Sequence, residues 1–142
     1  GVKSFVQFLS EFITSKDKSN KSQKRQEISN QSVKQCKRSI PMQVSTVKTF
    51  DEILKDLEAY DIIIFANECE KNAKLGDLNL NPQSKVAIII GSEGGFSSVE
   101  IDKLKNIGAK SISLGKRILR AETASIALTS CVMYLLGEWD YE

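Results

Sequence analysis

The sequence lacks histidine altogether and has few cysteines. Its three cysteines, Cys36, Cys69 and Cys131, form no Cys-x-x-Cys pair. We therefore expect no zinc site, because such sites draw on clustered cysteines and histidines. The absence of histidine also excludes Ser-His-Asp and Cys-His catalysis. An odd number of cysteines without a spacing pattern indicates reduced thiols, which is typical of a cytoplasmic protein.

Long hydrophobic runs are also missing. No apolar run approaches the roughly 20 residues that span a bilayer, and no basic-then-apolar leader with a cleavage site is visible. We therefore expect no membrane-spanning segment. The 142 residues, 41% of them hydrophobic, suffice for one globular domain with a buried core. The chain opens on Gly1 rather than Met, which indicates processing or a piece of a longer protein.

The net charge of +2 hides an uneven distribution. Residues 1–49 carry ten Lys and Arg against three acidic residues, whereas residues 50–142 carry ten against fifteen. A basic region of this kind is suited to an anionic surface, with nucleic acid as the first candidate. A solvated, lysine-rich face without a partner is an equally good interpretation of the same charges.

Continuous apolar runs predict the strands of a parallel sheet. Asp61–Ala66 and Lys85–Ile90 are apolar almost throughout, as strands buried on both faces are. Ser111–Gly115 is a third, shorter candidate, and Ser4–Leu9 alternates as a strand does. Strands that alternate with helices over short links indicate an α/β domain.

Helices are predicted between these runs and at the end of the chain. Gln23–Lys37 has a weak apolar side, and Thr49 with Glu52 forms a capping box before the next helix. The last helix, over Glu122–Leu136, is apolar nearly all round, so one sheet face cannot cover it. A second subunit is the leading candidate to cover the rest of the apolar surface of this helix. The polar stretch Thr14–Gln23 is expected to be a mobile loop.

A glycine-rich turn follows the second apolar run. Ser97 and Glu100 make another capping box, so the turn Gly91–Gly95 stands between a buried strand and the start of a helix. Gly108 is placed to end that helix. Ligands of open α/β sheets bind at such turns, where glycines let them approach the backbone. The pattern is neither a dinucleotide fingerprint nor a Walker loop, and a tight turn without a ligand is the alternative.

A second loop of similar design follows the third strand candidate. The stretch SLGKRILRAETA, residues 113–124, carries Gly115 and leads into the last helix. Together with IGSEGGFSSVE it resembles the signature loops of the RNA methyltransferases with an α/β trefoil knot. The nearest resemblance is to the ribosomal RNA small subunit methyltransferase E family, which methylates N3 of a uridine in 16S rRNA. The likeness is densest from Lys85 to Leu136, and it departs from the family's usual residues at Ser92, usually proline, and Lys37, usually glycine.

The resemblance implies a SPOUT-type fold, a mainly parallel sheet flanked by helices in which the chain after Ser113 threads through a loop to form a trefoil knot. It also implies a homodimer formed near the knot. The implied cofactor is S-adenosyl-L-methionine, held bent between the two loops, with its adenine among backbone groups of the second loop and with no metal. The residues expected at the cofactor are Phe65, Gly91, Glu93, Gly94, Gly95, Leu114, Gly115, Ile118, Leu119, Arg120, Thr123 and Ala124.

The implied reaction transfers a methyl group from a sulfonium to uracil N3, which must lose its proton. Arg120 is the candidate for the cation that stabilises the charge forming on the ring. Glu122 is the candidate that orients Arg120 or takes the proton, and Glu93 either shares that role or caps the adjoining helix. An acid at a helix N-terminus is also ordinary dipole complementarity. The candidates for binding RNA phosphate are Lys24, Lys34, Arg38, Lys116 and Arg117.

The family also carries an N-terminal RNA-binding domain of the PUA type, which we expect to be absent from this chain. Residues 1–142 are therefore expected to be the methyltransferase domain alone, acting in the cytoplasm on 16S rRNA or the small ribosomal subunit. Two alternatives stay open. One is a knotted ribose 2′-O-methyltransferase of tRNA or rRNA, although RILRAETA stands where those enzymes typically have a segment like SLNVS. The other is a non-catalytic RNA-binding domain of the same fold.

Overall fold

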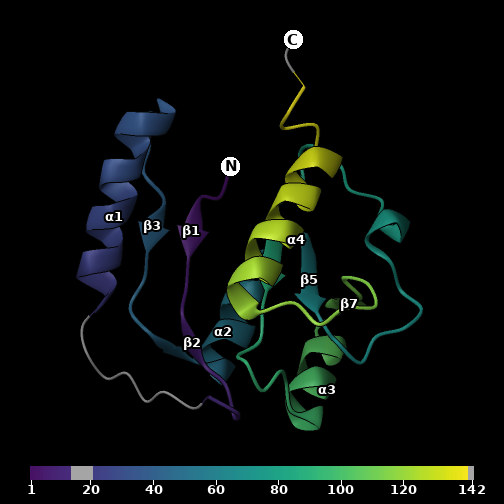
Figure 1. The fold of residues 1–142 in the computed structure, drawn as a ribbon. Coiled ribbons are helices and arrows are strands. Elements are labelled where there is room, and N and C mark those ends of the chain that lie inside the picture. Colours follow the sequence, from purple (N-terminus) through teal and green to yellow (C-terminus); the bar gives the residue numbers. More distant parts are fainter. Residues whose placement is uncertain (14–20, 141–142) are drawn as a thin grey trace.

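A three-stranded parallel sheet forms the centre of the molecule (Figure 1). The computed structural model describes residues 1–13 and 21–140. In the sheet, β5 (Ile62–Ala66) lies between β6 (Val86–Ile89) and β7 (Lys110–Ile112). These positions confirm the two long apolar runs as strands, and the third strand begins and ends earlier than Ser111–Gly115.

Helices cover both faces of this sheet, as the side chains of β5 show. Ile63 and Phe65 face one core together with α2 (Phe50–Leu57) and α3 (Ser98–Asn106). Ile64, which points to the opposite face, packs with Ile112, Leu128 and Val132 in a second core formed by β7 and α4 (Ala121–Leu135). The central strand is thus buried on both sides, and the expected α/β class is confirmed.

Two predicted capping boxes form at the starts of α2 and α3. The Thr49 hydroxyl accepts a hydrogen bond from Glu52 N at 3.2 Å, and the Glu52 carboxylate accepts one from Thr49 N at 2.7 Å. Ser97 and Glu100 make the same reciprocal pair. At the other end of α3, Gly108 has φ 83°, the left-handed conformation that glycine adopts without steric cost. The local signals for both helices are therefore confirmed.

The N-terminal region differs from the expected single strand over Ser4–Leu9. Two short strands form instead, β1 (Ser4–Phe5) against β3 (Gln43–Val44) and β2 (Phe8–Leu9) against β4 (Lys48–Thr49). Each pair depends on residues about forty positions away, a partner that a local alternation pattern cannot identify. The expectation of one continuous strand was wrong.

Beside these strands runs α1 (Lys21–Cys36), which confirms the predicted helix (Figure 1). It begins earlier than expected, so residues 21–23 are helical rather than part of a loop; the rest of that expected loop, residues 14–20, lies outside the described residues. The Ser29 hydroxyl donates to the Met42 carbonyl at 2.7 Å, and Val44 N donates to Gln26 Oε1 at 2.7 Å. Polar contacts therefore attach a helix whose apolar side is weak.

Lys37, the residue after α1, has φ 56°. This left-handed conformation is costly for a residue with a Cβ and is where helices commonly place glycine. It gives a physical reason for the glycine that the resemblance expects at this position.

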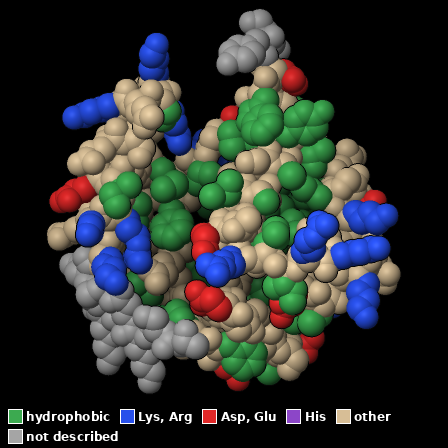
Figure 2. Space-filling model, in the orientation of Figure 1, with side chains coloured by type: hydrophobic (Ala, Val, Ile, Leu, Met, Phe, Trp, Pro, Cys, Tyr) green, Lys and Arg blue, Asp and Glu red, His purple; other side chains and the backbone are tan. Residues whose placement is uncertain are grey.

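One side of α4 has no cover in the described part of the chain. Ile126 is 71% exposed and Tyr134 65% exposed, although both are large apolar or aromatic residues. Figure 2 shows hydrophobic side chains gathered along this helix. No helix among residues 1–13 and 21–140 is long and apolar enough to cross a membrane.

Candidate functional site

Three loops meet at one edge of the sheet, because β5, β6 and β7 are parallel and end there (Figure 1). They are residues 67–70 after β5, residues 90–97 after β6 and residues 113–120 after β7. Asn67 connects β5 to β7, since its backbone N donates to the Ile112 carbonyl at 3.0 Å and its Nδ2 donates to Ser111 Oγ at 3.2 Å. The two loops predicted to face one pocket therefore leave the same edge of the sheet, one on each side of β5.

The glycines of the first loop are required by its own packing. Gly95 has φ 70° and donates its N–H to the Ser92 carbonyl at 2.9 Å, which closes a tight turn. A Cβ on Gly91 would lie 3.1 Å from the Gly95 carbonyl carbon, and one on Gly94 would lie 2.8 Å from Cβ of Phe12. The tight-turn interpretation thus explains these glycines, and a ligand is an additional role for the turn rather than its only reason.

The second loop presents backbone groups that suit a polar ligand. Gly115 has φ 103°, and its N–H is held by Ser113 Oγ at 3.2 Å. Within the described part of the chain, the backbone N–H groups of Leu114, Ile118 and Leu119 have no protein partner. A Cβ on Gly115 would meet nothing within 4 Å, so the loop has free space beside it. These unused donors fit the expected contacts to an adenine ring.

Arg120 occupies the N-cap position of α4. Its side chain is exposed and makes no hydrogen bond or ion pair with any described residue. Glu122 is in the first turn of the same helix, where a carboxylate complements the helix dipole. No ion pair joins it to Arg120 within the described residues. Both candidates for catalysis are thus available to a substrate.

Among the other candidates, Phe65 and Ala124 have buried side chains. Phe65 is fully buried and packs edge-on against Phe96, with ring centroids 5.7 Å apart. Ala124 is 7% exposed in the sheet-facing side of α4. Only the backbones of these two residues can face a ligand. Glu93 and Thr123 are exposed, whereas Ile118, 80% exposed, offers an apolar side chain at the loop surface.

The basic candidates form two separate groups. Lys24 and Lys34 are exposed on α1, and Arg38 follows that helix, with Nη1 donating to the Val2 carbonyl at 2.9 Å. Lys116 and Arg117 are exposed in the second loop after β7. Figure 1 places α1 and β7 on opposite sides of the molecule, and Figure 2 shows Lys and Arg side chains on both sides. A single copy therefore presents two basic surfaces rather than one.

Two carboxylates at this edge make contacts that the sequence pattern did not predict. Glu70 Oε1 accepts hydrogen bonds from Lys71 N, Asn72 N and Ala73 N, and the Asn72 and Ala73 bonds lower the pKa of Glu70 most. Glu100 is only 5% exposed and contacts the N-terminal segment as well as its own capping box. The S-x-x-E pattern identified Glu100 as a cap, but no local signal indicates its long-range partners.

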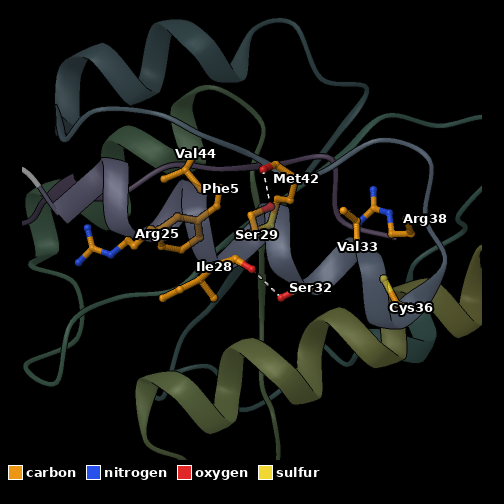
Figure 3. Close-up of a pocket in the computed structure, with 10 residues that line it drawn as sticks. All are labelled: Phe5, Arg25, Ile28, Ser29, Ser32, Val33, Cys36, Arg38, Met42 and Val44. Atoms are coloured by element: carbon orange, nitrogen blue, oxygen red, sulfur yellow. Dashed lines mark hydrogen bonds between the residues drawn. The ribbon is translucent and has the colours of Figure 1, made fainter.

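A cavity of about 350 Å³ lies away from these loops, against α1, β1 and β3 (Figure 3). Its lining is mainly apolar and includes Phe5, Ile28 and Met42, with Arg25 and Arg38 toward opposite ends in the view. No group of three or more His, Cys, Asp or Glu residues within 1–13 and 21–140 has the arrangement to hold a metal ion.

The fold and loops define a class of protein. The model of the RNA methyltransferase domain family matches residues 1–133, so the chain belongs to that family. It is 34% identical over 138 residues to the ribosomal RNA small subunit methyltransferase E of Mesomycoplasma hyopneumoniae, covering 93% of this chain and 59% of that protein. The protein of the same name from Aquifex aeolicus is 33% identical over 135 residues, covering 94% and 57%.

A solved structure shows the same architecture. The ribosomal RNA small subunit methyltransferase E from Neisseria gonorrhoeae, bound to S-adenosyl methionine, matches with a TM-score of 0.76 and 28% identity, over 95% of this chain and 56% of that one. The chain spans somewhat more than half the length of these relatives. The matches confirm the resemblance expected from the two loops and the SPOUT-type α/β fold that it implied.

Proposed function

We propose that residues 1–142 are the methyltransferase domain of an enzyme that uses S-adenosyl-L-methionine to methylate N3 of a uridine in 16S rRNA. The observation that carries the proposal is the convergence of two ligand-competent loops at one sheet edge in a member of the RNA methyltransferase family. The names of the relatives support ribosomal RNA as the substrate, and the Neisseria structure supports the cofactor. The protein would act in the cytoplasm, where ribosomal subunits assemble.

In this proposal the cofactor lies between the first loop and the second. Backbone groups of Leu114, Ile118 and Leu119 hydrogen-bond the adenine, because these N–H groups have no protein partner in the described chain. The Gly91–Gly95 turn approaches from β6 and is rigid through its own Ser92–Gly95 hydrogen bond. Pre-formed walls of this kind reduce the entropy lost on binding.

The bound cofactor supplies the methyl group on a positively charged sulfur, so it carries the difficult chemistry. The chain has to orient uracil, exclude water and manage the proton on N3. Arg120, which has no competing partner in the described chain, stabilises the negative charge that develops over O2, N3 and O4. Glu122, two residues further on, or Glu93 in the first loop accepts the proton.

A homodimer is part of the proposal. The exposed apolar side chains of α4, such as Ile126 and Tyr134, require cover that the described chain does not supply. A two-fold interface that includes residues 122–136 would bury them against the same helix of a second copy. Sedimentation should therefore give a dimer at micromolar concentration, and Ile126→Lys should shift it to monomer. A monomeric parent chain would contradict this.

The reaction itself is tested by single-turnover methyl transfer. Purified 30S subunits lacking the modification are mixed with the full-length protein and labelled S-adenosyl-L-methionine, and the product nucleoside is identified by mass spectrometry. The proposal expects 3-methyluridine in 16S rRNA. Label on a ribose 2′-oxygen would favour the ribose methyltransferase alternative, and no transfer despite cofactor and RNA binding would favour a non-catalytic RNA-binding domain.

A further inference from the structure

The segment Ser10–Phe12, which follows β2, lies against the Gly91–Gly95 turn although some 80 residues separate them in the sequence. It is attached at two places, to the Glu100 carboxylate and to the turn itself. The need to cap the start of α3 does not by itself explain why a distant segment makes these contacts with the turn and with Glu100.

The first attachment is through Glu100. Its Oε1 accepts a hydrogen bond from Glu11 N at 2.9 Å, and its Oε2 accepts from Ser97 N at 2.9 Å and from Ser10 Oγ at 3.3 Å. The side chain is 5% exposed and no described polar side-chain atom at this site is left unsatisfied. Hydrogen bonds to a buried carboxylate are stronger than those between neutral groups, so this carboxylate joins α3 firmly to the N-terminal segment.

The second attachment is through Phe12. Ser92 Oγ donates to the Phe12 carbonyl at 3.3 Å. The Gly94 backbone approaches so closely that a Cβ there would lie 2.8 Å from Cβ of Phe12. One segment thus contacts the turn at Ser92 and Gly94 and also contacts Glu100, just beyond the turn.

The capping box at the start of α2 shows what a helix start needs by itself. Among the described residues, the Glu52 carboxylate accepts only from Thr49 N at 2.7 Å and Thr49 Oγ at 3.0 Å, and Glu52 lies at the surface. α2 therefore begins without a buried carboxylate or a third segment. The additional partners of Glu100 are not required for capping.

We infer that Glu100 is a positioning residue for cofactor binding: it holds Ser10–Phe12 against the Gly91–Gly95 turn and so fixes the backbone of that turn before the ligand arrives. The inference rests on the proposed function, since it takes the turn to be one wall of the S-adenosyl-L-methionine site. Glu100 itself touches neither cofactor nor RNA in this account.

The test compares Glu100→Gln with Glu52→Gln. Glutamine has the same shape, but its NH₂ group donates, so it cannot accept from both Ser97 N and Glu11 N. Both variants remove the charge of a capping-box carboxylate, but only Glu100→Gln also replaces one of two accepting oxygens and so loosens the turn. Calorimetric titration with S-adenosyl-L-methionine, at a temperature where thermal melting shows both variants folded, should give about tenfold weaker binding for Glu100→Gln. Glu52→Gln should stay within about twofold of the parent chain.

A second comparison approaches the contact from the other side. Gly94→Ala should displace Phe12 and weaken binding by a similar factor, whereas Gly76→Ala, where a Cβ would meet nothing within 4 Å, should not. Adding Phe12→Gly to Gly94→Ala removes the obstructing Cβ, so the double variant should recover affinity. Failure to recover would mean that Gly94→Ala acts directly on the ligand and would remove the Phe12 attachment from the account.

The outcomes separate the two proposals. No binding by the parent chain would contradict the proposed function. If the parent binds and Glu100→Gln binds with the same affinity, only the positioning role is contradicted. The same holds if Glu100→Gln and Glu52→Gln lose affinity equally.

Amide hydrogen exchange without ligand gives a readout independent of binding. Exchange at residues 92–95 should rise in Glu100→Gln and not in Glu52→Gln, and unchanged exchange would overturn the inference.

Discussion

Replacing Lys37 by glycine should stabilise the protein, because Lys37 occupies a left-handed backbone conformation that glycine adopts without steric cost. Lys37 has φ 56° directly after α1. A side chain with a Cβ pays roughly 1–2 kcal/mol in that conformation, while glycine adopts it freely but loses more entropy on folding, by roughly 0.5–1 kcal/mol. The difference predicts a gain of about 1 kcal/mol in the free energy of unfolding. At the average entropy of unfolding per residue, this raises Tm by about 3 °C.

Lys34→Gly is the matched control, because the same substitution falls inside α1 at an exposed position. Glycine there should lower stability by roughly 0.5–1 kcal/mol. Urea unfolding followed by far-ultraviolet circular dichroism measures both variants, and equal m-values would show that the midpoint differences are differences in stability. Two destabilised variants would refute the reasoning about the left-handed position.

Three further predictions concern the site. In single-turnover transfer at saturating cofactor and RNA, Arg120→Ala should lower the rate by about 10²-fold or more, whereas Arg117→Ala should mainly weaken RNA binding and flatten its salt dependence. Gly95→Val should weaken S-adenosyl-L-methionine binding at least about tenfold in calorimetry, and Gly108→Val, equally left-handed but with nothing within 4 Å of its Cβ, should not. Hydrogen bonds from Asn72 and Ala73 hold the pKa of Glu70 below its usual value, so the stabilisation is present above the unfolded-state pKa and is lost as pH falls through the folded-state pKa. Urea midpoints measured from neutral to acid pH should therefore fall less steeply in Glu70→Gln.

Much of the fold could be predicted from local signals in the sequence. The apolar runs around β5 and β6 predicted buried parallel strands because both faces of each strand meet a core. Two S/T-x-x-E patterns predicted the starts of α2 and α3, since a capping box depends only on four consecutive residues. Gly108 ends α3 for an equally local reason.

Features that depend on distant partners could not be predicted in this way. β1 and β2 are two residues each, and they exist through pairing with β3 and β4, far along the chain. α1 is attached by Gln26 and Ser29 to the strand region rather than by an apolar stripe, so its early start gave no periodic signal. In the candidate site, the two loops were visible from their glycines, but the contacts of Glu100 and Phe12 across some 80–90 residues were not.

S-adenosyl-L-methionine is proposed to bind between the loops that follow β6 and β7, and an amide-resolved NMR titration of the chain with this cofactor tests the proposal. Saturable shifts are expected for the amides of residues 91–95 and 114–120, whereas the amides around the cavity at α1, such as those of Ile28 and Met42, should not shift. Shifts confined to that cavity, or no shifts at millimolar cofactor, would contradict it.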